Sequence, residues 1–359
     1  MVTRWRRFVR WIVTLDHETS LSPSLLSLGT ERAYETLPSV TNYIFCLGGR
    51  LRTNRIMSWY KYLPVIVFVI IIMPCVLFSI FETPYNVSRH DNLSLISLVV
   101  LFYYFWAMTL LTFLRTATGD PGMLPRNIHP GQWQSFDNNN NNNLIVSQFF
   151  TPQDYYNIIT LPAHTSKKNH PERNNTIDIK YCWTCKIWRP PRSHHCPTCD
   201  VCIQTHDHHC MWVNNCVGQR NYRYFISFLI ASTFTSSLLI ITSLIHLHRV
   251  HWVVKRSPVS VFLIIYGGLT IWYPFILLLY HIAMTATQQT TREYLKTMSD
   301  NSVKNPVMHP RIKRVSTNIF DRGNCVTNMF SLMGQVRGPN LWPPRDRVSR
   351  SGDWRLQKW

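Results

Sequence analysis

The stretch "CWTCKIWRPPRSHHCPTCDVCIQTHDHHCMWVNNC", from Cys182 to Cys216, decides how the sequence folds. It holds seven of the ten cysteines and five of the fifteen histidines of the 359-residue chain. Disulfide frameworks of secreted domains rarely interleave histidines with cysteines, so this mixture indicates metal binding. The spacing Cys-x2-Cys brings two sulfurs to one tetrahedral ion. It occurs at Cys182/Cys185, Cys196/Cys199 and Cys199/Cys202.

The number of ligands does not by itself show whether one thiol stays free. Two tetrahedral ions take eight ligands, and the seven cysteines with His195 already supply eight. If a second histidine is a ligand, one cysteine is left over, but the spacing does not show which one. A purely structural metal module fits the same count.

Four apolar runs surround this stretch, and each is long enough to cross a bilayer as a helix of about 20 residues. Soluble core helices rarely run this far without a charge. We therefore predict an all-α polytopic membrane protein with four transmembrane helices. A small zinc-stabilised, cysteine-rich domain in the cytosol lies between helices 2 and 3. The runs cover residues 62–81, 93–114, 224–245 and 259–280.

The basic residues predict the orientation of the chain in the membrane. The sequence has 37 Lys and Arg against 18 Asp and Glu, a net charge of +19. Only four basic residues lie in the two short loops on one side: Arg89, Arg249, Lys255 and Arg256. Positive residues favour the cytoplasmic face, so we expect both termini and the cysteine-rich domain in the cytosol. The excess charge then faces an anionic membrane surface rather than nucleic acid.

Six regions are expected from these features. The asparagine run at 138–143 is low in complexity and is expected to be an insertion without regular structure. The regions are a cytosolic N-terminal region (1–61), helices 1 and 2 (62–114), a cytosolic linker (115–179), the two-zinc domain (180–223), helices 3 and 4 (224–280) and a cytosolic C-terminal region (281–359).

The pattern C-x2-C-x9-H-C-x2-C-x2-C-x4-D-H-H-C-x5-C resembles the cysteine-rich domain of the Asp-His-His-Cys (DHHC) family of protein S-palmitoyltransferases. Other segments resemble motifs of the same family: "TGDPG" at 118–122, "TTRE" at 290–293 and "NIFDRGNCVTNMFSLMG" at 318–334, with Asn328 at the motif's asparagine. The resemblance covers residues 62–334. Non-catalytic segments, including "NYIFCLGGRLRT" at 42–53 and "KIWRPPRSHHC" at 186–196, resemble the fungal members that palmitoylate Ras-like GTPases.

This resemblance implies which thiol is free. One zinc ion would be held by Cys182, Cys185, His195 and Cys202, and the other by Cys196, Cys199, His209 and Cys216. Cys210 is then the remaining thiol and the nucleophile. Both metal sites would be closed, which is the structural kind.

The resemblance also implies a mechanism and partners. His208 would act as the base, Asp207 would fix its tautomer, and palmitoyl-CoA would donate the acyl group. Arg220 and Arg223 are candidates for contacting the CoA phosphates, and Trp212 for lining the mouth of the acyl site. The fungal members work with a small accessory subunit at the endoplasmic reticulum membrane.

Two neighbours of the motif need separate interpretation. Met211 stands where the family commonly has proline, and we expect altered loop stiffness rather than lost activity. His206 lies outside the motif, and we expect it in a solvated loop.

Other functions fit parts of the sequence. A non-catalytic membrane scaffold with a zinc-binding interaction module is the main alternative. A membrane-anchored ubiquitin ligase fits less well, because the ligand order does not suit a cross-braced ring. A nucleic-acid-binding zinc finger fits least well, because no base-reading helix follows the ligands in this sequence.

Overall fold

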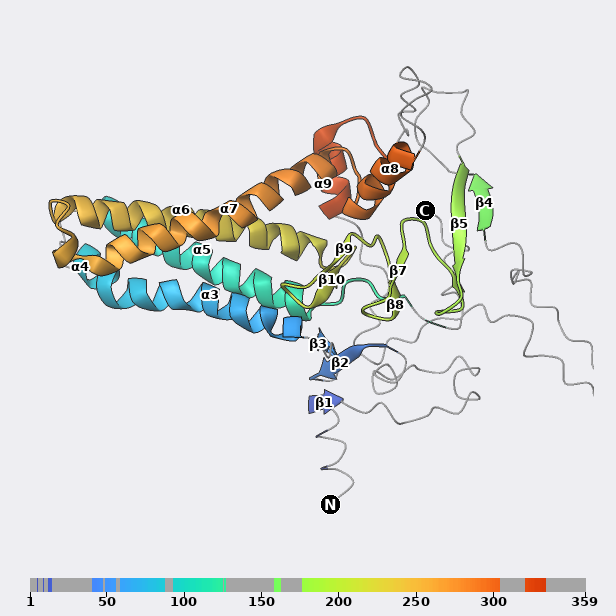
Figure 1. Cartoon of the computed structure of the whole chain (residues 1–359), viewed down its shortest axis with the longest axis horizontal. Coiled ribbons are helices and arrows are strands. Elements are labelled where there is room, and N and C mark those ends of the chain that lie inside the picture. Colours follow the sequence, from blue (N-terminus) through green and yellow to red (C-terminus); the bar gives the residue numbers. More distant parts are fainter. Residues whose placement is uncertain are drawn as a thin grey trace, which may run out of the picture.

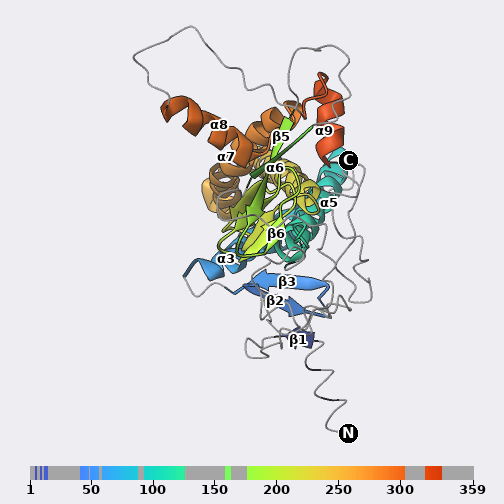
Figure 2. The ribbon, with the colours of Figure 1, turned by 90° about the vertical axis from the view of Figure 1, so that its right-hand side faces the viewer.

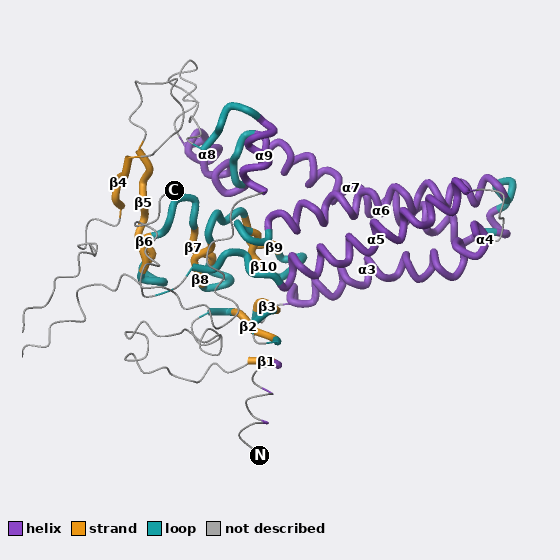
Figure 3. Tube along the Cα trace, turned by 180° about the vertical axis from the view of Figure 1, so that it is seen from behind, coloured by secondary structure: helices purple, strands orange, loops and turns teal. Residues whose placement is uncertain are grey.

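The structure is a computed structural model. It describes residues 12–14, 41–47, 49–55, 59–87, 93–124, 158–162, 176–303 and 320–333, with Trp5, Val9 and Arg126. Four long helices lie side by side, and short strands gather at one end of this bundle (Figure 1; Figure 3). The asparagine run and most of the N-terminal region lie outside the described residues.

The helices follow the four apolar runs and extend a few residues beyond them. The first span begins with the 3-10 turn Trp59–Tyr62 and continues through α3 (Leu63–Leu77), the π-helical turn Phe78–Glu82 and α4 (Thr83–Val87). The others are α5 (Leu93–Thr118), α6 (Tyr222–Arg249) and α7 (Pro258–Ala286).

Each span is long and apolar enough to cross a membrane. Large apolar side chains remain on the outside of the bundle: Leu269 is 75% exposed, and Val65 and Ile276 are each 59% exposed. Lipid tails cover such side chains as well as a protein core does. The predicted fold class is therefore confirmed, and the chain is a multi-pass membrane protein.

Glu82 and His246 form a buried ionisable pair at the end of the bundle that carries α4. Glu82 is fully buried, and its Oε2 lies 2.6 Å from His246 Nδ1 on α6. Ser260 on α7 donates to the other carboxyl oxygen, and the ring of Tyr85 stacks on His246 at 3.9 Å. A carboxyl group within a membrane span needs such partners. The cluster therefore ties the first, third and fourth spans together.

The cysteine-rich domain consists of short antiparallel strands. β4 (Ile158–Pro162) pairs with β5 (Thr176–Cys182), and β5 pairs with β6 (Ile187–Trp188). Two further hairpins carry the remaining ligands: β7 (His194–Cys196) with β8 (Val201–Ile203), and β9 (His208–Cys210) with β10 (Asn215–Val217). The core between these hairpins is largely cysteine.

A small N-terminal sheet packs on this domain. β1 (Val13–Thr14), β2 (Tyr43–Cys46) and β3 (Leu51–Asn54) form it, and Figure 2 shows it beside the helix ends. Tyr43 and Phe45 are fully buried in a cluster with Met123 and the cysteines Cys196, Cys199 and Cys216. Part of the expected N-terminal region is therefore an integral layer of the cysteine-rich domain.

Asp120, just after α5, is a buried carboxylate that joins three parts of the chain. Its Oδ1 accepts hydrogen bonds from the backbone N–H groups of Gly122 (2.9 Å) and Met123 (3.1 Å). Arg52 of β3 lies 3.2 Å from Oδ1, and Arg220 donates to Oδ2. Burial alone would raise the pKa of Asp120, but the two guanidinium groups and the backbone donors lower it to about 2.

A second junction joins β10 to the end of α5. The Asn215 side chain donates to the carbonyl oxygens of Thr116 and Gly119, at 2.9 Å each. A side chain at Gly218 has no room, because its Cβ would lie 2.5 Å from the Pro121 carbonyl oxygen. The cysteine-rich domain is thus fixed directly to the helix ends.

Two further helices follow the fourth span, α8 (Thr291–Val303) and α9 (Cys325–Met333). Asn328 is buried on α9, and its Nδ2 donates to the Ala286 carbonyl oxygen at 2.8 Å. This bond holds α9 against the end of α7, where Leu332 joins the apolar cluster near the start of α6.

Replacing Asp120 with asparagine should destabilise the protein by about 3–5 kcal/mol, because it leaves two buried guanidinium groups without a counter-charge. The contribution of Asp120 is present above its unfolded pKa and is lost as the pH falls towards 2. Thermal unfolding in detergent measures the change. The Asp200→Asn variant is the control, since the Asp200 carboxylate pairs with Arg126 but is 37% exposed. Equal unfolding temperatures for the two variants would contradict the role of Asp120.

Candidate active site and metal clusters

The first candidate metal cluster contains Cys182, Cys185, His195 and Cys202, whose ligand atoms all lie within 4.8 Å of one another. His195 and Cys202 are paired across β7 and β8, so their side chains lie on the same face of the hairpin. His195 Nδ1 is 3.4 Å from the Cys185 sulfur and 3.9 Å from the Cys202 sulfur. Three thiols and one imidazole nitrogen can therefore hold one ion.

The second cluster contains Cys196, Cys199, His209 and Cys216, again within 4.8 Å of one another. His209 and Cys216 are directly opposite in the β9–β10 hairpin. His209 Nδ1 lies 3.4, 3.6 and 3.8 Å from the sulfurs of Cys199, Cys216 and Cys196. The two groups interleave along the chain and are the same eight residues that the resemblance implies.

Cys210 belongs to neither cluster, and the alternation of β9 explains why. Successive side chains of a strand point to opposite faces. His209 faces the second metal cluster, so its neighbours His208 and Cys210 face the other way. Cys210 is 9% exposed and lies in an apolar cluster with Phe113, Phe225 and other side chains of the helices. The free thiol therefore sits where the cysteine-rich domain meets the bundle.

His208 forms a short hydrogen bond with the carboxylate of Asp207. His208 Nδ1 lies 2.6 Å from Asp207 Oδ2, and Asp207 is 2% exposed. Burial alone would lower the pKa of His208, but the Asp207 hydrogen bond and contact with Cys210 raise it to about 10. Burial alone would raise the pKa of Asp207, but the His208 hydrogen bond and charge lower it to about 2. The three groups can together hold a proton close to the sulfur.

The "TTRE" motif completes this arrangement from beyond the fourth span. The Thr291 N–H donates to Asp207 Oδ1 at 2.8 Å, which places the carboxylate at the N-terminus of α8. Thr290 and Glu293 cap that helix reciprocally, by bonds of 2.9 and 3.2 Å. Glu293 also binds Arg192 of the cysteine-rich domain through both carboxylate oxygens, at 2.8 and 2.7 Å. Glu293 therefore joins the start of α8 to the cysteine-rich domain.

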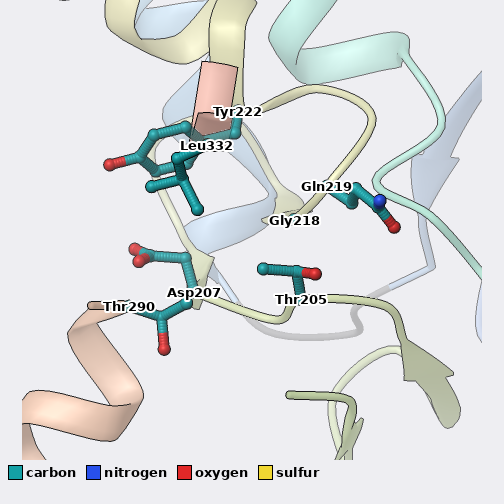
Figure 4. A pocket seen from close by; sticks show the side chains of 7 residues that line it. All are labelled: Thr205, Asp207, Gly218, Gln219, Tyr222, Thr290 and Leu332. Atoms are coloured by element: carbon teal, nitrogen blue, oxygen red, sulfur yellow. The ribbon is translucent and has the colours of Figure 1, made fainter. Parts of the chain in front are cut away.

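Beside Asp207 lies a cavity of about 10 Å³, enough for about one water molecule. Figure 4 shows that the cysteine-rich domain, the start of α6, the turn before α8 and helix α9 all contribute to its wall. The lining residues are Thr205, Asp207, Gly218, Gln219, Tyr222, Thr290 and Leu332. Four separate segments of the chain thus converge on this carboxylate.

The three candidates for contact with acyl-CoA lie in different surroundings. Arg220 is held by Asp120, with its side chain 9% exposed, so a contact with CoA phosphates would require it to leave this partner. Arg223 is half-buried, and it donates to the Tyr224 hydroxyl at 2.8 Å. Trp212 is 41% exposed, and its ring lies 5.8 Å from that of Tyr273 on α7.

His206 is not in a solvated loop, so that prediction was wrong. It is 4% exposed, and its Nε2 lies 3.7 Å from the Cys216 sulfur. The Asp207 N–H donates to the Val217 carbonyl oxygen at 3.0 Å. This bond holds the chain just before β9 against β10, and His206 is thereby buried beside the second cluster. Sequence spacing gives no sign of this packing.

His281 on α7 is a further residue of the site, which the sequence did not indicate. It is 1% exposed, and one of its ring nitrogens lies within 4.8 Å of ligand atoms of Asp207 and His208. The Tyr222 hydroxyl lies 3.1 Å from His281 Nδ1, and the ring of Phe225 packs on both histidines. A histidine at the end of an apolar run was the only available signal.

Comparison with known proteins assigns the family. The family model described as DHHC palmitoyltransferase matches residues 175–298. Palmitoyltransferase ERF2 of Saccharomyces cerevisiae is 46% identical to this chain over 349 residues, covering 97% of this chain and 88% of that protein. The chain belongs to the DHHC palmitoyltransferase family.

Further DHHC palmitoyltransferases are similar along nearly the whole chain. Palmitoyltransferase ERF2 of Eremothecium gossypii is 43% identical over 98% of this chain and 86% of the relative. Palmitoyltransferase ERF2 of Kluyveromyces lactis is 41% identical over 98% of this chain and 89% of the relative. The N-terminal sheet and the C-terminal helices are therefore included in the similarity.

Metal content should distinguish the cluster residues from Cys210. Replacing His209 with alanine should reduce the bound metal from two ions to one per chain, because the second cluster keeps only three ligands. The Cys210→Ser variant should keep both ions. Inductively coupled plasma mass spectrometry of the purified variants gives the count. Loss of an ion from Cys210→Ser would make that thiol a ligand.

Proposed function

We propose that this chain is a protein S-palmitoyltransferase that moves a palmitoyl group from palmitoyl-CoA to cysteines of membrane-associated proteins. The observation that supports it most is the separation of Cys210 from both metal clusters, with the Asp207–His208 pair beside it. Family membership supplies the reaction class. The geometry supports particular roles for these residues.

The ions are two structural zinc ions. In a tetrahedron with metal–sulfur bonds of about 2.3 Å and metal–nitrogen bonds of about 2.0 Å, a ligand nitrogen and a ligand sulfur lie about 3.5 Å apart. In the second cluster, the separations of 3.4–3.8 Å between His209 Nδ1 and the sulfurs fit that size. Zinc supplies no reaction step here, since both donor sets are full. It holds strands too short to be stable alone.

In the first step, the Cys210 sulfur attacks the thioester carbon of palmitoyl-CoA. His208, whose pKa is raised to about 10, holds the thiol proton as an imidazolium ion, and Asp207 stabilises this charge. A carbon–sulfur bond to Cys210 forms while the bond to CoA breaks. The departing CoA sulfur takes the proton from His208, leaving acylated Cys210 and free CoA.

In the second step, a substrate cysteine attacks the acyl group on Cys210. His208 accepts the proton of the substrate thiol, and Cys210 leaves as a thiolate beside the imidazolium. One thioester replaces another in each step, so the exchange is close to balanced in energy. Neither step needs metal activation.

The apolar surroundings of Cys210 support a long acyl chain as the transferred group. Burial contributes about 0.8 kcal/mol per CH₂, so a palmitoyl chain gains about 12 kcal/mol among the helices. The buried side chains that form one cluster with Cys210, including Phe113, Phe225 and Leu229, give this sulfur apolar surroundings. Arg223 and Trp212 remain candidates for contacts at the cytosolic mouth, and Arg220 would first have to leave Asp120.

The setting of the enzyme follows from the basic residues and the resemblance. We place it in the endoplasmic reticulum membrane with both termini and the catalytic domain in the cytosol. Ras-like GTPases with cysteines close to the membrane are the proposed substrates, and a small accessory subunit is the proposed partner. A non-catalytic scaffold would not require an Asp207–His208 pair beside a free thiol, so the scaffold alternative does not account for this arrangement.

Incubation with palmitoyl-CoA should add one hydroxylamine-labile palmitoyl group to the wild-type chain and none to Cys210→Ser. Intact-mass spectrometry measures the addition, and the metal content of both proteins is counted in parallel. Absence of acylation in the wild type, with the accessory subunit present, would favour the scaffold.

The Asp207→Asn variant should acylate itself at least about 100-fold more slowly, because the neutral amide cannot stabilise a protonated His208. Stopped reactions followed by mass spectrometry give the rate. Asp200→Asn makes the same chemical change away from Cys210 and should react at the wild-type rate. Because Asp200 Oδ1 lies 3.6 Å from His195 Nε2, the metal content of this variant is counted as well. A wild-type rate for Asp207→Asn would remove Asp207 from the mechanism.

A further inference from the structure

Two buried side chains of the N-terminal hairpin, residues 41–55, point at one sulfur of the second metal cluster. Asn54 Nδ2 lies 3.0 Å from the Cys199 sulfur, and the Tyr43 hydroxyl lies 3.2 Å from it. Asn54 is 4% exposed, and both Tyr43 and Cys199 are fully buried. Water therefore cannot replace either donor.

The backbone of the same hairpin fixes this geometry. The Asn42 N–H donates to the Cys199 carbonyl oxygen at 3.1 Å, and the Asn42 side chain donates to the Thr198 carbonyl oxygen at 3.1 Å. Asn54 also reaches the Thr198 carbonyl oxygen, at 3.3 Å. The hairpin thus holds the turn that carries Cys199 from both of its strands.

The charge of a filled cluster makes such donors important. Three thiolates outweigh the two positive charges of a zinc ion, so the second cluster is anionic, and its cysteines are at most 2% exposed. Donors to a ligating sulfur stabilise its negative charge and fix its orientation, and loss of such contacts costs about 10–100-fold in metal affinity. The Tyr43 and Asn54 side chains both donate to Cys199, which belongs to the second cluster.

The hairpin also holds the loop that follows Cys210. The Asn214 side chain donates to the Asn54 carbonyl oxygen at 2.9 Å and to the Thr53 hydroxyl at 3.2 Å. The Tyr43 hydroxyl is shared between Cys199 and the Asn215 side-chain oxygen, 2.9 Å away. Asn215 is paired with Cys210 across the β9–β10 hairpin.

We propose that the N-terminal hairpin is an outer shell of the second zinc cluster, in which Asn54 and Tyr43 are positioning residues that retain the ion through Cys199. The inference rests on the proposed zinc content and not on acyl transfer. It gives the N-terminal region a direct role in keeping the reactive loop in place.

The test follows zinc release from the purified full-length protein into excess 4-(2-pyridylazo)resorcinol. Asn54→Ala should release one of the two zinc ions about 10–100-fold faster than the wild type, and the other at the wild-type rate. Tyr43→Phe should accelerate the same ion to a smaller extent. Asn42→Ala is the matched control. Asn42 lies on the same hairpin as Asn54, and its side chain donates to the Thr198 carbonyl oxygen but not to a sulfur.

Alkylation with N-ethylmaleimide during release, followed by peptide mapping, identifies the ion. In Asn54→Ala, Cys196, Cys199 and Cys216 should be labelled earlier than in the wild type, with unchanged labelling of Cys182, Cys185 and Cys202. Wild-type release from Asn54→Ala and Tyr43→Phe, or equal acceleration of both ions, would overturn the inference. A wild-type protein without two zinc ions would instead contradict the proposed zinc content.

Discussion

The alternation of a single short strand underlies the whole site. β9 has three residues, and its middle side chain, His209, faces a metal cluster while its outer two face the helices. The metal cluster fixes the strand, and the strand in turn fixes the direction of Cys210 and His208. The candidate ligand His209 and the proposed nucleophile Cys210 can thus be neighbours in sequence without competing for the same ion. A shift of one residue would exchange their faces.

Buried polar contacts fix the cysteine-rich domain to the ends of the membrane helices. Asp120 binds Arg52 and Arg220 at the end of α5, and Asn215 binds two carbonyl oxygens there. These bonds are buried, so they are stronger than comparable contacts in water. They place the thiol of Cys210 at the boundary between the apolar bundle and the polar domain.

The membrane spans could be predicted from sequence, because a run of about 20 apolar residues without a charge is typical of a transmembrane helix and rare in a soluble protein. The eight cluster residues and the free thiol of Cys210 were predicted from the resemblance to the family, because the ligand count and the spacing alone left open which cysteine is free. The contacts of Glu82 with His246 and of Asn54 with Cys199 could not be predicted, since 164 and 145 residues separate the partners. The burial of His206 and the position of His281 depend on packing between helices and hairpins, which no local pattern encodes.

The hydrogen bond from Thr291 to Asp207 has a consequence for biosynthesis. Asp207 precedes the third span, but its backbone donor follows the fourth. A nascent chain that has made its cysteine-rich domain therefore still lacks one hydrogen-bond donor to the Asp207 carboxylate. The ribosome must finish all four spans before α8 can form and supply this donor. The surroundings of Asp207 are thus completed only after the whole membrane part has been synthesised.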